Sequence, residues 1–315
     1  MKLLVTGGLG FIGSNFIEHI LKTKSNVEVV NIDKCDYMAR ENNVDPHPRY
    51  TYIRADITER YHMTHIFKEH QPEVVIHFAA QSCVDRSFDQ SFQFTKDNVL
   101  GTHVLLDTAK EYGKLEKFIH ISTDEVYGEV PPDTVSCETS PLNPSNPYSA
   151  SKAAAELYVK AYMNGYKLPC IITRGNNVFG PKQYPEKVVP LFISKILSDT
   201  PCPIHGNGET RRNFIYVDDV SRAVETILEK GEIGKTYNIG SSHEYSVNEI
   251  FNKIKTLAGK GECVYIKDRP FNDSRYCIDS SNLRALGWCE NEDFETDLLK
   301  TISWYEANPY WFTSD

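Results

Sequence analysis

Short apolar runs rich in β-branched residues recur through the first half of the chain and alternate with amphipathic stretches. The runs cover residues 3–6, 27–32, 50–54, 74–78, 118–122 and 170–174. The segment VVIHFAA is apolar almost throughout, a pattern typical of a strand covered on both faces, as parallel sheets require. The alternation of such strands with helical stretches predicts an α/β fold with a doubly wound parallel sheet of Rossmann type.

The pattern changes after Gly180, where prolines divide the chain into loops and short helices. These prolines are Pro181, Pro185, Pro190, Pro201 and Pro203. We expect residues 1–180 to form the main domain and residues 181–315 a smaller lobe, packed together with a cleft between them. A segment of about 210–240 is expected to return to the first domain. A strand at 236–239, a helix at 247–257 and a strand at 263–266 are expected to lie partly against it.

Composition and charge exclude several classes of function. The net charge of −9 disfavours a general nucleic-acid or anionic-membrane surface. No segment is apolar for long enough to cross a bilayer, and a first strand beginning at Lys2 leaves no room for a signal peptide, so a cytoplasmic location is expected. The eight cysteines are scattered without a Cys-x-x-Cys pair, which indicates reduced thiols. We expect no metal site, and we interpret His62 and His65 as surface helix residues.

A glycine-rich turn directly follows the first strand, in the run LLVTGGLGFIG. Gly8, Gly10 and Gly13 have the spacing G-x-G-x-x-G, which lets the backbone approach a pyrophosphate at a helix N-terminus. Glycine turns also simply connect strands to helices, so the position after a strand is what favours dinucleotide binding. Gly7, Phe11 and Ile12 belong to the same predicted cofactor turn.

Acidic and small residues at later strand ends extend this predicted site. Asp33 lies 20 residues after Gly13, where a carboxylate accepts the ribose hydroxyls and repels a 2′-phosphate, so NAD is favoured over NADP. Lys34 beside it leaves room for the opposite preference. Asp56 and Ile57 either flank the adenine or form an ordinary turn. The small residues that end the fourth strand suit a backbone close to a cofactor; they follow Phe78 and are Ala79, Ala80, Gln81 and Ser82.

Two further groups carry the chemistry. Tyr148 and Lys152 fall on one face of a helix that begins near Pro147, and a lysine ammonium favours the phenolate and lowers the tyrosine pKa. Such a pair oxidises alcohols, although Tyr-x-x-x-Lys is also a common surface pair. The run Thr123-Asp124-Glu125 ends a strand and supplies paired carboxylates for removing water. A solvated acidic pair is the alternative reading.

These motifs together resemble the extended short-chain dehydrogenases/reductases, and in particular the nucleotide-sugar 4,6-dehydratases (dTDP-glucose and UDP-glucose). The resemblance covers residues 2–304, and its most specific element is Thr123-Asp124-Glu125 in HISTDEVYGE. It implies that Thr123 and Tyr148 contact the sugar C4 hydroxyl, with Lys152 beside them. Asp124 is implied as the acid at the C6 hydroxyl and Glu125 as the base at C5. The first domain is then the NAD-binding domain, and the C-terminal lobe binds the nucleotide sugar.

The same resemblance implies a set of substrate-binding residues. Asn177 matches the family's sugar-nucleotide asparagine, Arg212 matches the arginine that holds the diphosphate, and Arg211 is a less certain candidate. The other implied residues are Ser82, Thr123, Glu186, Lys187, Val188, Pro203, His205, Asn248 and Arg269.

The segment DRPFNDSRY (268–276) departs from the bacterial dTDP-glucose enzymes at Phe271 and Asn272. It resembles instead the UDP-glucose 4,6-dehydratases that supply UDP-rhamnose synthesis in plants, so we favour UDP-glucose over dTDP-glucose. The resemblance also implies a homodimer through helices near 95–111 and 149–162, whose amphipathic pattern a buried core explains equally well. A UDP-sugar 4-epimerase or decarboxylase, and a non-catalytic NAD-binding scaffold, are the competing hypotheses.

Overall fold

A seven-stranded parallel sheet lies at the centre of the computed structural model of this chain, which describes residues 1–131, 133–268, 273, 275–291 and 293–312. Its strand order is β10-β6-β5-β4-β1-β2-β3, with every neighbouring pair parallel. The strands are β1 (Lys2–Thr6), β2 (Glu28–Asp33), β3 (Tyr50–Arg54), β4 (Val74–His77), β5 (Lys117–Thr123), β6 (Cys170–Gly175) and β10 (Thr236–Ile239). The predicted fold class is confirmed, and all six strands predicted in the first half are present, with ends shifted by at most one residue.

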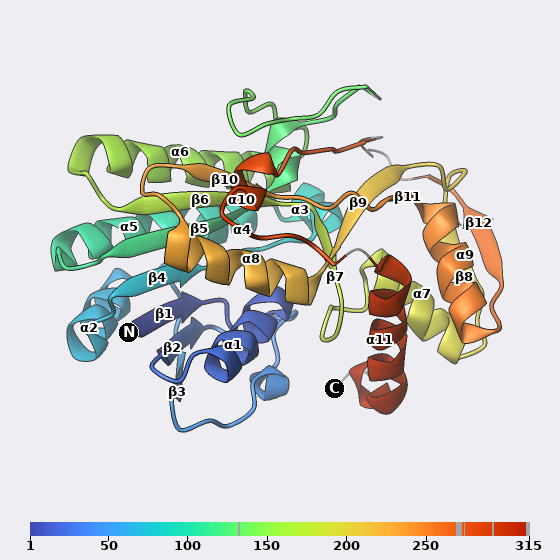
Figure 1. The fold of residues 1–315 in the computed structure, drawn as a ribbon, viewed down its shortest axis with the longest axis horizontal. Coiled ribbons are helices and arrows are strands. Elements are labelled where there is room, and N and C mark those ends of the chain that lie inside the picture. The colour runs from blue at the N-terminus through green and yellow to red at the C-terminus, as the bar shows by residue number, and fades with distance from the viewer. Residues whose placement is uncertain (132, 269–272, 274, 292, 313–315) are drawn as a thin grey trace.

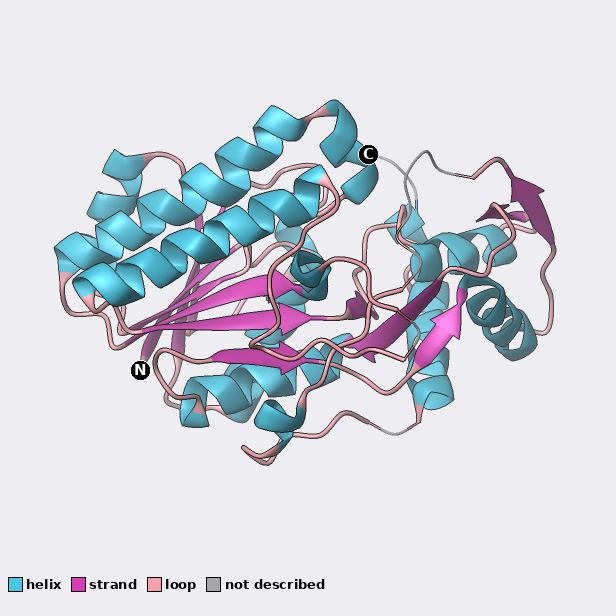
Figure 2. Ribbon diagram, turned by 90° about the horizontal axis from the view of Figure 1, so that it is seen from above, coloured by secondary structure: helices cyan, strands magenta, loops and turns pink. Residues whose placement is uncertain are grey.

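Helices cover both faces of this sheet (Figure 1). The side chains of β1 alternate, so Leu3 packs into the core under one layer of helices and Leu4 into the core under the other. One layer contains α1 (Phe11–Thr23) and α8 (Val217–Lys230), and the other contains α2 (Arg60–His70), α5 (Gly101–Tyr112) and α6 (Pro147–Tyr166). Figure 2, seen from above, shows long helices running beside each other over the strands. This two-layer cover makes the sheet doubly wound.

Short helical segments connect the strand ends to the longer helices. They are η1 (Glu41–Asn43), α3 (Val84–Asp89), α4 (Ser91–Phe94), the π-helical η2 (Thr95–Leu100) and η3 (Asp124–Tyr127). The turn η3 follows β5 directly, so the acidic pair lies at the carboxyl edge of the sheet, where ligands bind in open α/β folds.

The C-terminal region contains two small sheets, ordered β11-β9-β7 and β12-β8. Its strands are β7 (Asn177–Phe179), β8 (Cys202–His205), β9 (Arg211–Tyr216), β11 (Glu244–Ser246) and β12 (Cys263–Ile266). Its helices are α7 (Val188–Leu197), α9 (Val247–Ala258), α10 (Ser281–Arg284), α11 (Phe294–Ala307) and the 3-10 turn η4 (Pro309–Phe312). The helices α7, α9 and α11 share a separate apolar core with β8.

Only part of the later chain returns to the large sheet. β10 pairs with β6 at the sheet edge, and α8 packs against α1. By contrast, α9 packs against α7 and α11, and β12 pairs with β8, so the expectation that these two elements lie against the first domain was wrong. The apolar face of α9, with Ile250 and Ile254, is buried in the C-terminal core instead.

Candidate active site

A tight glycine turn joins β1 to α1 and forms one end of the main pocket. Gly7 has φ +73°, and a Cβ placed there would lie 2.5 Å from the backbone nitrogen of Ala79. A Cβ on Gly13 would lie 2.4 Å from the carbonyl oxygen of Gly7. Gly10 precedes the first residue of α1, so the helix N-terminus faces the pocket. Any larger residue at Gly7 or Gly13 would close this cradle.

The spacing that lines the pocket differs from the predicted one. Gly7, Gly10 and Gly13 line it, whereas Gly8 packs against the side chains of Asn31 and Ile17. Gly8 therefore serves the packing of the turn onto β2, and its predicted place in a G-x-G-x-x-G cofactor motif was wrong. The structural pattern is G-x-x-G-x-x-G, beginning one residue earlier.

Apart from Gly8, the predicted cofactor residues line this one pocket. They are Gly7, Gly10, Phe11, Ile12, Gly13, Asp33, Lys34, Asp56, Ile57, Phe78, Ala79, Ala80, Tyr148 and Lys152. Several residues that the sequence reasoning did not single out line it as well, notably the segment after β2 (Asp36, Tyr37, Met38, Ala39) and Tyr184. Their position directly after the Asp33 strand was the available signal.

The end of β2 carries a carboxylate that accepts hydrogen bonds from two backbone N–H groups. Asp33 Oδ2 accepts from Leu9 N (2.9 Å) and Oδ1 accepts from Cys35 N (2.8 Å), while burial raises the pKa of Asp33. Lys34 Nζ lies 2.7 Å from Asp97 Oδ2 and 3.4 Å from Asp36 Oδ2. Because two carboxylates already pair with Lys34, its charge is compensated, and the site favours a ribose hydroxyl over a 2′-phosphate.

The acidic pair lies in η3 at the end of β5. The hydroxyl of Thr123 accepts from Glu125 N (3.3 Å) and donates to Asp124 Oδ1 (3.2 Å). Asp124 is 2% exposed, and burial, with the charge of Glu125 second, raises its pKa to about 7. Burial also raises the pKa of Glu125. One carboxyl of the pair is therefore able to hold a proton near neutral pH.

A capped helix places Tyr148 and Lys152 beside the acidic turn. Asn146 forms a capping box with Ser149, and Pro147 occupies the first turn of α6. Tyr148 and Lys152 are both buried, one turn apart. Lys152 Nζ donates to the carbonyl of Ile121 (2.6 Å), and burial lowers its pKa to about 8.

The predicted lowering of the Tyr148 pKa was wrong for the structure described here. Burial is the largest influence and raises the pKa of Tyr148, and the charges of Glu125 and Asp124 raise it further. A hydrogen bond with Thr123 opposes this rise only in part. The phenol is therefore protonated at neutral pH, because desolvation of the phenolate outweighs nearby donors.

A buried ion pair supports η3, the turn that carries the acidic pair. Arg174 of β6 pairs with Glu156 of α6 at 2.6 Å, and both side chains are at most 1% exposed. Arg174 Nη1 also donates to the hydroxyl of Tyr127 (2.7 Å), which in turn donates to Asn238 Oδ1 (2.8 Å). The last residue of η3 is thus tied to β6 and β10. This support was not predicted, and its only signal in the sequence was an arginine near the end of an apolar strand.

Two predicted substrate residues, Arg212 and Lys187, lie close enough to the acidic pair for their charges to act on it. The positive charges of Arg212 and Lys187 oppose the rise in the pKa of Glu125 that burial causes, and the charge of Arg212 opposes the rise in the pKa of Asp124. Lys187 Nζ donates to the carbonyl of Ser82 (3.1 Å), and both residues line the main pocket. Asn177 begins β7, Val188 begins α7, and Glu186 has a buried Oε1 with no hydrogen-bond partner among the described residues.

Other predicted substrate residues lie elsewhere in the C-terminal region. Pro203 and His205 belong to β8, and Asn248, at the start of α9, bonds to Asn207 and Glu209. None of these residues lines the main pocket. Arg269 lies outside the described residues, as do Phe271 and Asn272. Arg211 forms an ion pair with Glu249 (3.1 Å).

Two features are absent from the described part of the chain. It contains no cluster of three or more His, Cys, Asp or Glu side chains able to hold a metal ion, and His62 and His65 are exposed on α2. Within the same residues, no helix is long and apolar enough to span a membrane.

Similar proteins include dehydratases of two nucleotide classes. The chain is 43% identical over 99% of its length to the Arabidopsis thaliana trifunctional UDP-glucose 4,6-dehydratase/UDP-4-keto-6-deoxy-D-glucose 3,5-epimerase/UDP-4-keto-L-rhamnose-reductase. It spans about half of that relative, 48%. It is 45% identical to the mouse (Mus musculus) dTDP-D-glucose 4,6-dehydratase, covering 98% of this chain and 89% of that protein.

Solved structures agree with this comparison. The dTDP-glucose 4,6-dehydratase DesIV from Streptomyces venezuelae, with NAD and TYD bound, superposes with TM-score 0.94 at 35% identity, covering 99% of this chain and 98% of that one. A Thermotoga maritima UDP-glucose 4-epimerase with UDP-glucose gives 0.92 at 31% identity, covering 98% and 100%. A family model described as GDP-mannose 4,6 dehydratase matches residues 4–301, and the chain therefore belongs to this family.

Proposed function

We propose that this chain is an NAD-dependent hydro-lyase, an NDP-glucose 4,6-dehydratase that converts UDP-glucose or dTDP-glucose to the 4-keto-6-deoxy sugar. The reaction comprises C4 oxidation, loss of water across C5 and C6, and reduction at C6. The observation that carries this proposal is the acidic pair Asp124 and Glu125 beside Tyr148, with charged residues from the C-terminal region facing it. Alcohol oxidation and water removal are thereby combined in one site.

The pocket suits NAD. The cradle around Gly7 and Gly13 excludes a side chain and leaves backbone for a pyrophosphate, and Asp33 stands where ribose hydroxyls are bound. NAD, when bound, supplies a hydride acceptor for C4 and a hydride donor for C6. NAD-bound relatives of the same fold support the assignment.

The chain's own residues account for the proton transfers. Oxidation at C4 requires removal of the hydroxyl proton, for which Tyr148 and Thr123 are placed, with Lys152 buried one turn further along α6. The C4 ketone acidifies the C5 proton, so a single carboxylate, Glu125, suffices as base, and the same group returns a proton to C5 when hydride adds at C6. Asp124, whose pKa is near neutral, gives its proton to the leaving C6 hydroxyl.

This assignment predicts a pH dependence for water loss. The pKa of Asp124 is about 7, so its acid form is depleted as pH rises above that value. The rate of water loss is expected to fall about tenfold for each further pH unit. Single-turnover water loss measured from about pH 6 to 9 checks this, with ¹³C NMR of labelled aspartate in wild type and Asp124→Asn identifying the titrating group. A rate that stays constant across the range contradicts the role of Asp124 as acid.

The decisive experiment is incubation with UDP-glucose and with dTDP-glucose, followed by mass analysis of the sugar. A product lighter by one water supports the dehydratase. Failure with both nucleotides overturns it, and an isomer of unchanged mass indicates a 4-epimerase. Release of carbon dioxide in a separate incubation with a UDP-sugar acid indicates a decarboxylase. Binding of NAD without any turnover indicates the scaffold hypothesis.

We infer that UDP-glucose is the preferred substrate. The C-terminal sequence DRPFNDSRY and the dehydratase named for UDP-glucose among the relatives support this choice. A pocket distinguishes one methyl group by about 10- to 100-fold, so the ratio of kcat/KM for the two nucleotides measures the preference. A ratio favouring dTDP-glucose contradicts it.

We further propose a cytoplasmic homodimer. Each chain has an NAD-binding part (1–180) and a part that mostly binds the nucleotide sugar (181–315). Within the second part, a segment of about 210–240 returns to the first. Exposed apolar side chains on the helices expected at the interface support the dimer: Leu100 (46% exposed) and Leu157 (59%). All eight cysteines are free thiols, which agrees with a reducing compartment. The mass in solution tests the dimer.

A further inference from the structure

Two buried asparagines hold the two acidic side chains, one each. Asn176 Nδ2 donates to Asp124 Oδ2 at 2.7 Å, and Asn146 Nδ2 donates to Glu125 Oε2 at 3.0 Å. Each asparagine is 5% exposed. Resting on the proposed function, we propose that Asn176 and Asn146 are positioning residues that separately set the acid at C6 and the base at C5.

The orientation of each amide is determined by a backbone N–H at its other end. Asn176 Oδ1 accepts from Ser241 N (3.0 Å), and Asn146 Oδ1 accepts from Ser149 N (2.8 Å). A flipped amide would place its NH₂ group against a backbone donor and its oxygen against a carboxylate. Both contacts would be repulsive, so only the observed orientation satisfies all the groups. Each carboxylate therefore faces a donor.

This arrangement selects which oxygen of each carboxyl reacts. Asn176 occupies Oδ2 of Asp124, so the proton of the acid form belongs on Oδ1, which accepts from the Thr123 hydroxyl only while the carboxyl is ionised. Asn146 occupies Oε2 of Glu125 and leaves Oε1 to take the C5 proton. The two donors also lower the pKa of their carboxyls, against the effect of burial.

The position of Asn176 follows from strand register. Thr123 of β5 is the partner of Gly175 in β6, so the residues that follow, Asp124 and Asn176, leave the sheet beside each other. The backbone N–H of Asn176 donates to the carbonyl of Ile239 at 3.1 Å. Asn176 is therefore held from both neighbouring strands.

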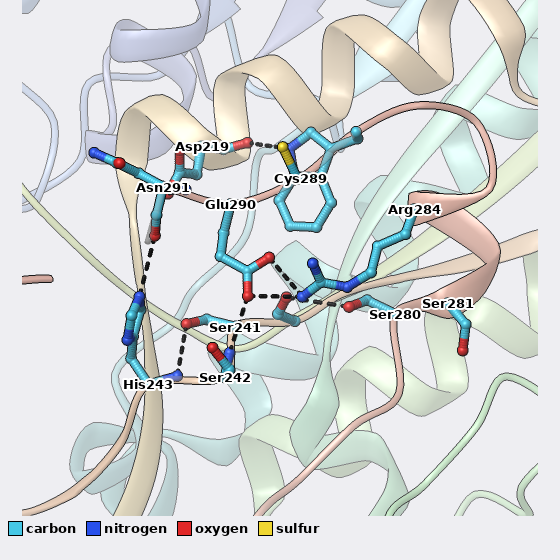
Figure 3. Close-up of polar contacts among 12 residues, drawn as sticks. Asp219, Ser241, Ser242, His243, Ser280, Ser281, Arg284, Cys289, Glu290 and Asn291 are labelled. Carbon is cyan, nitrogen blue, oxygen red and sulfur yellow. Dashed lines mark hydrogen bonds and ion pairs between the residues drawn. The ribbon is translucent and has the colours of Figure 1, made fainter. Parts of the chain in front are cut away.

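The loop that orients Asn176 is itself held by a polar cluster behind the site. Ser241 Oγ accepts from His243 N (3.0 Å), and the next backbone N–H, of Ser242, donates to Glu290 Oε1 (3.2 Å). Figure 3 shows Arg284 directed at the same carboxylate, with Nη2 2.7 Å from Oε1. The loop that carries the Ser241 N–H is therefore held in place by its own hydrogen bonds.

The test compares Asn176→Ala with Asn146→Ser. Serine retains an N-cap oxygen for Ser149 N–H but lacks the amide donor to Glu125. Each variant is assayed for C4 oxidation, by absorbance of reduced nicotinamide in a single turnover, and for dehydration of nucleotide glucose. Each is also assayed with the 6-deoxy-6-fluoro analogue, whose fluoride leaves without a proton.

Both variants are expected to keep C4 oxidation within about threefold of wild type while dehydration falls about 10- to 100-fold. The fluoro analogue restores elimination in Asn176→Ala, because the acid is no longer needed. It does not restore elimination in Asn146→Ser, which still lacks a positioned base.

Normal C4 oxidation in the same sample is the folding control. Loss of C4 oxidation as large as the loss of dehydration, in either variant, overturns the inference, because the asparagine then supports the whole site. Failure of the fluoro analogue to restore Asn176→Ala, or its success with Asn146→Ser, overturns the inference too. If wild type itself dehydrates neither nucleotide sugar, the proposed function is what fails.

Discussion

Glu125→Gln is expected to reduce water loss about 10²- to 10⁴-fold, the usual contribution of a general base. The amide is nearly the same size as the carboxylate but cannot accept the C5 proton. C4 oxidation and NAD content should remain close to wild type, because Glu125 is absent from the lining of the cofactor pocket. Exchange of the C5 hydrogen in D₂O, followed by NMR, measures the missing step directly.

Glu116→Gln is the matched control, since it makes the same chemical change at an exposed position outside the site. It should leave every step unchanged. Wild-type exchange at C5 in Glu125→Gln would assign the base to another residue.

Tyr148→Phe is expected to reduce C4 oxidation about 10²- to 10⁴-fold. The hydroxyl is the group placed to exchange a proton with the C4 oxygen, whereas the ring packs against Phe94 and is retained. Rapid mixing with the nucleotide sugar should show no rise in reduced nicotinamide absorbance. Thermal unfolding should differ little from wild type, since the apolar part of the side chain is unchanged.

Two controls isolate the phenol. Tyr61→Phe makes the same change at a side chain that is 93% exposed and should have no effect. Supplied with the 4-keto-6-deoxy product, Tyr148→Phe should still exchange the C5 hydrogen through Glu125, because that substrate is already a ketone. Substantial C4 oxidation in Tyr148→Phe would contradict its role.

The strands and the order of the chemical groups were predictable because they depend on local patterns. Apolar runs covered on both faces located the six strands of the first half, and turns after them located the pocket. Asp33, Thr123 and Ala79 each end or follow a strand, and parallel strands bring their carboxyl ends to one edge. The part of the cofactor lining at the strand ends was therefore predictable, whereas the segment after β2 and Tyr184 were not predicted.

Other predictions failed where an effect depends on neighbours distant in sequence. Gly8 fits a glycine motif, but Asn31 of the next strand occupies the space beside it. The chain spacing of Tyr148 and Lys152 suggested a lowered phenol pKa, but spacing does not report desolvation, which dominates there. The residues predicted around β8 to bind the base lie in the C-terminal region outside the cofactor pocket, so their role stays a prediction.

The sequence by itself determined the α/β class, the NAD-type pocket and the presence of an oxidising pair and an acidic pair, because each is written in residues close together in the chain. Only the tertiary structure decided which oxygen of Asp124 and of Glu125 accepts a hydrogen bond. It also decided which side chains have shifted pKa values and which residues support the acidic pair. Asn176, Ser241 and Arg174 approach the acidic turn through strand register and loop packing. Hydrogen bonds and burial act over a few ångströms in space, so contacts among these groups exist only once the sheet has formed.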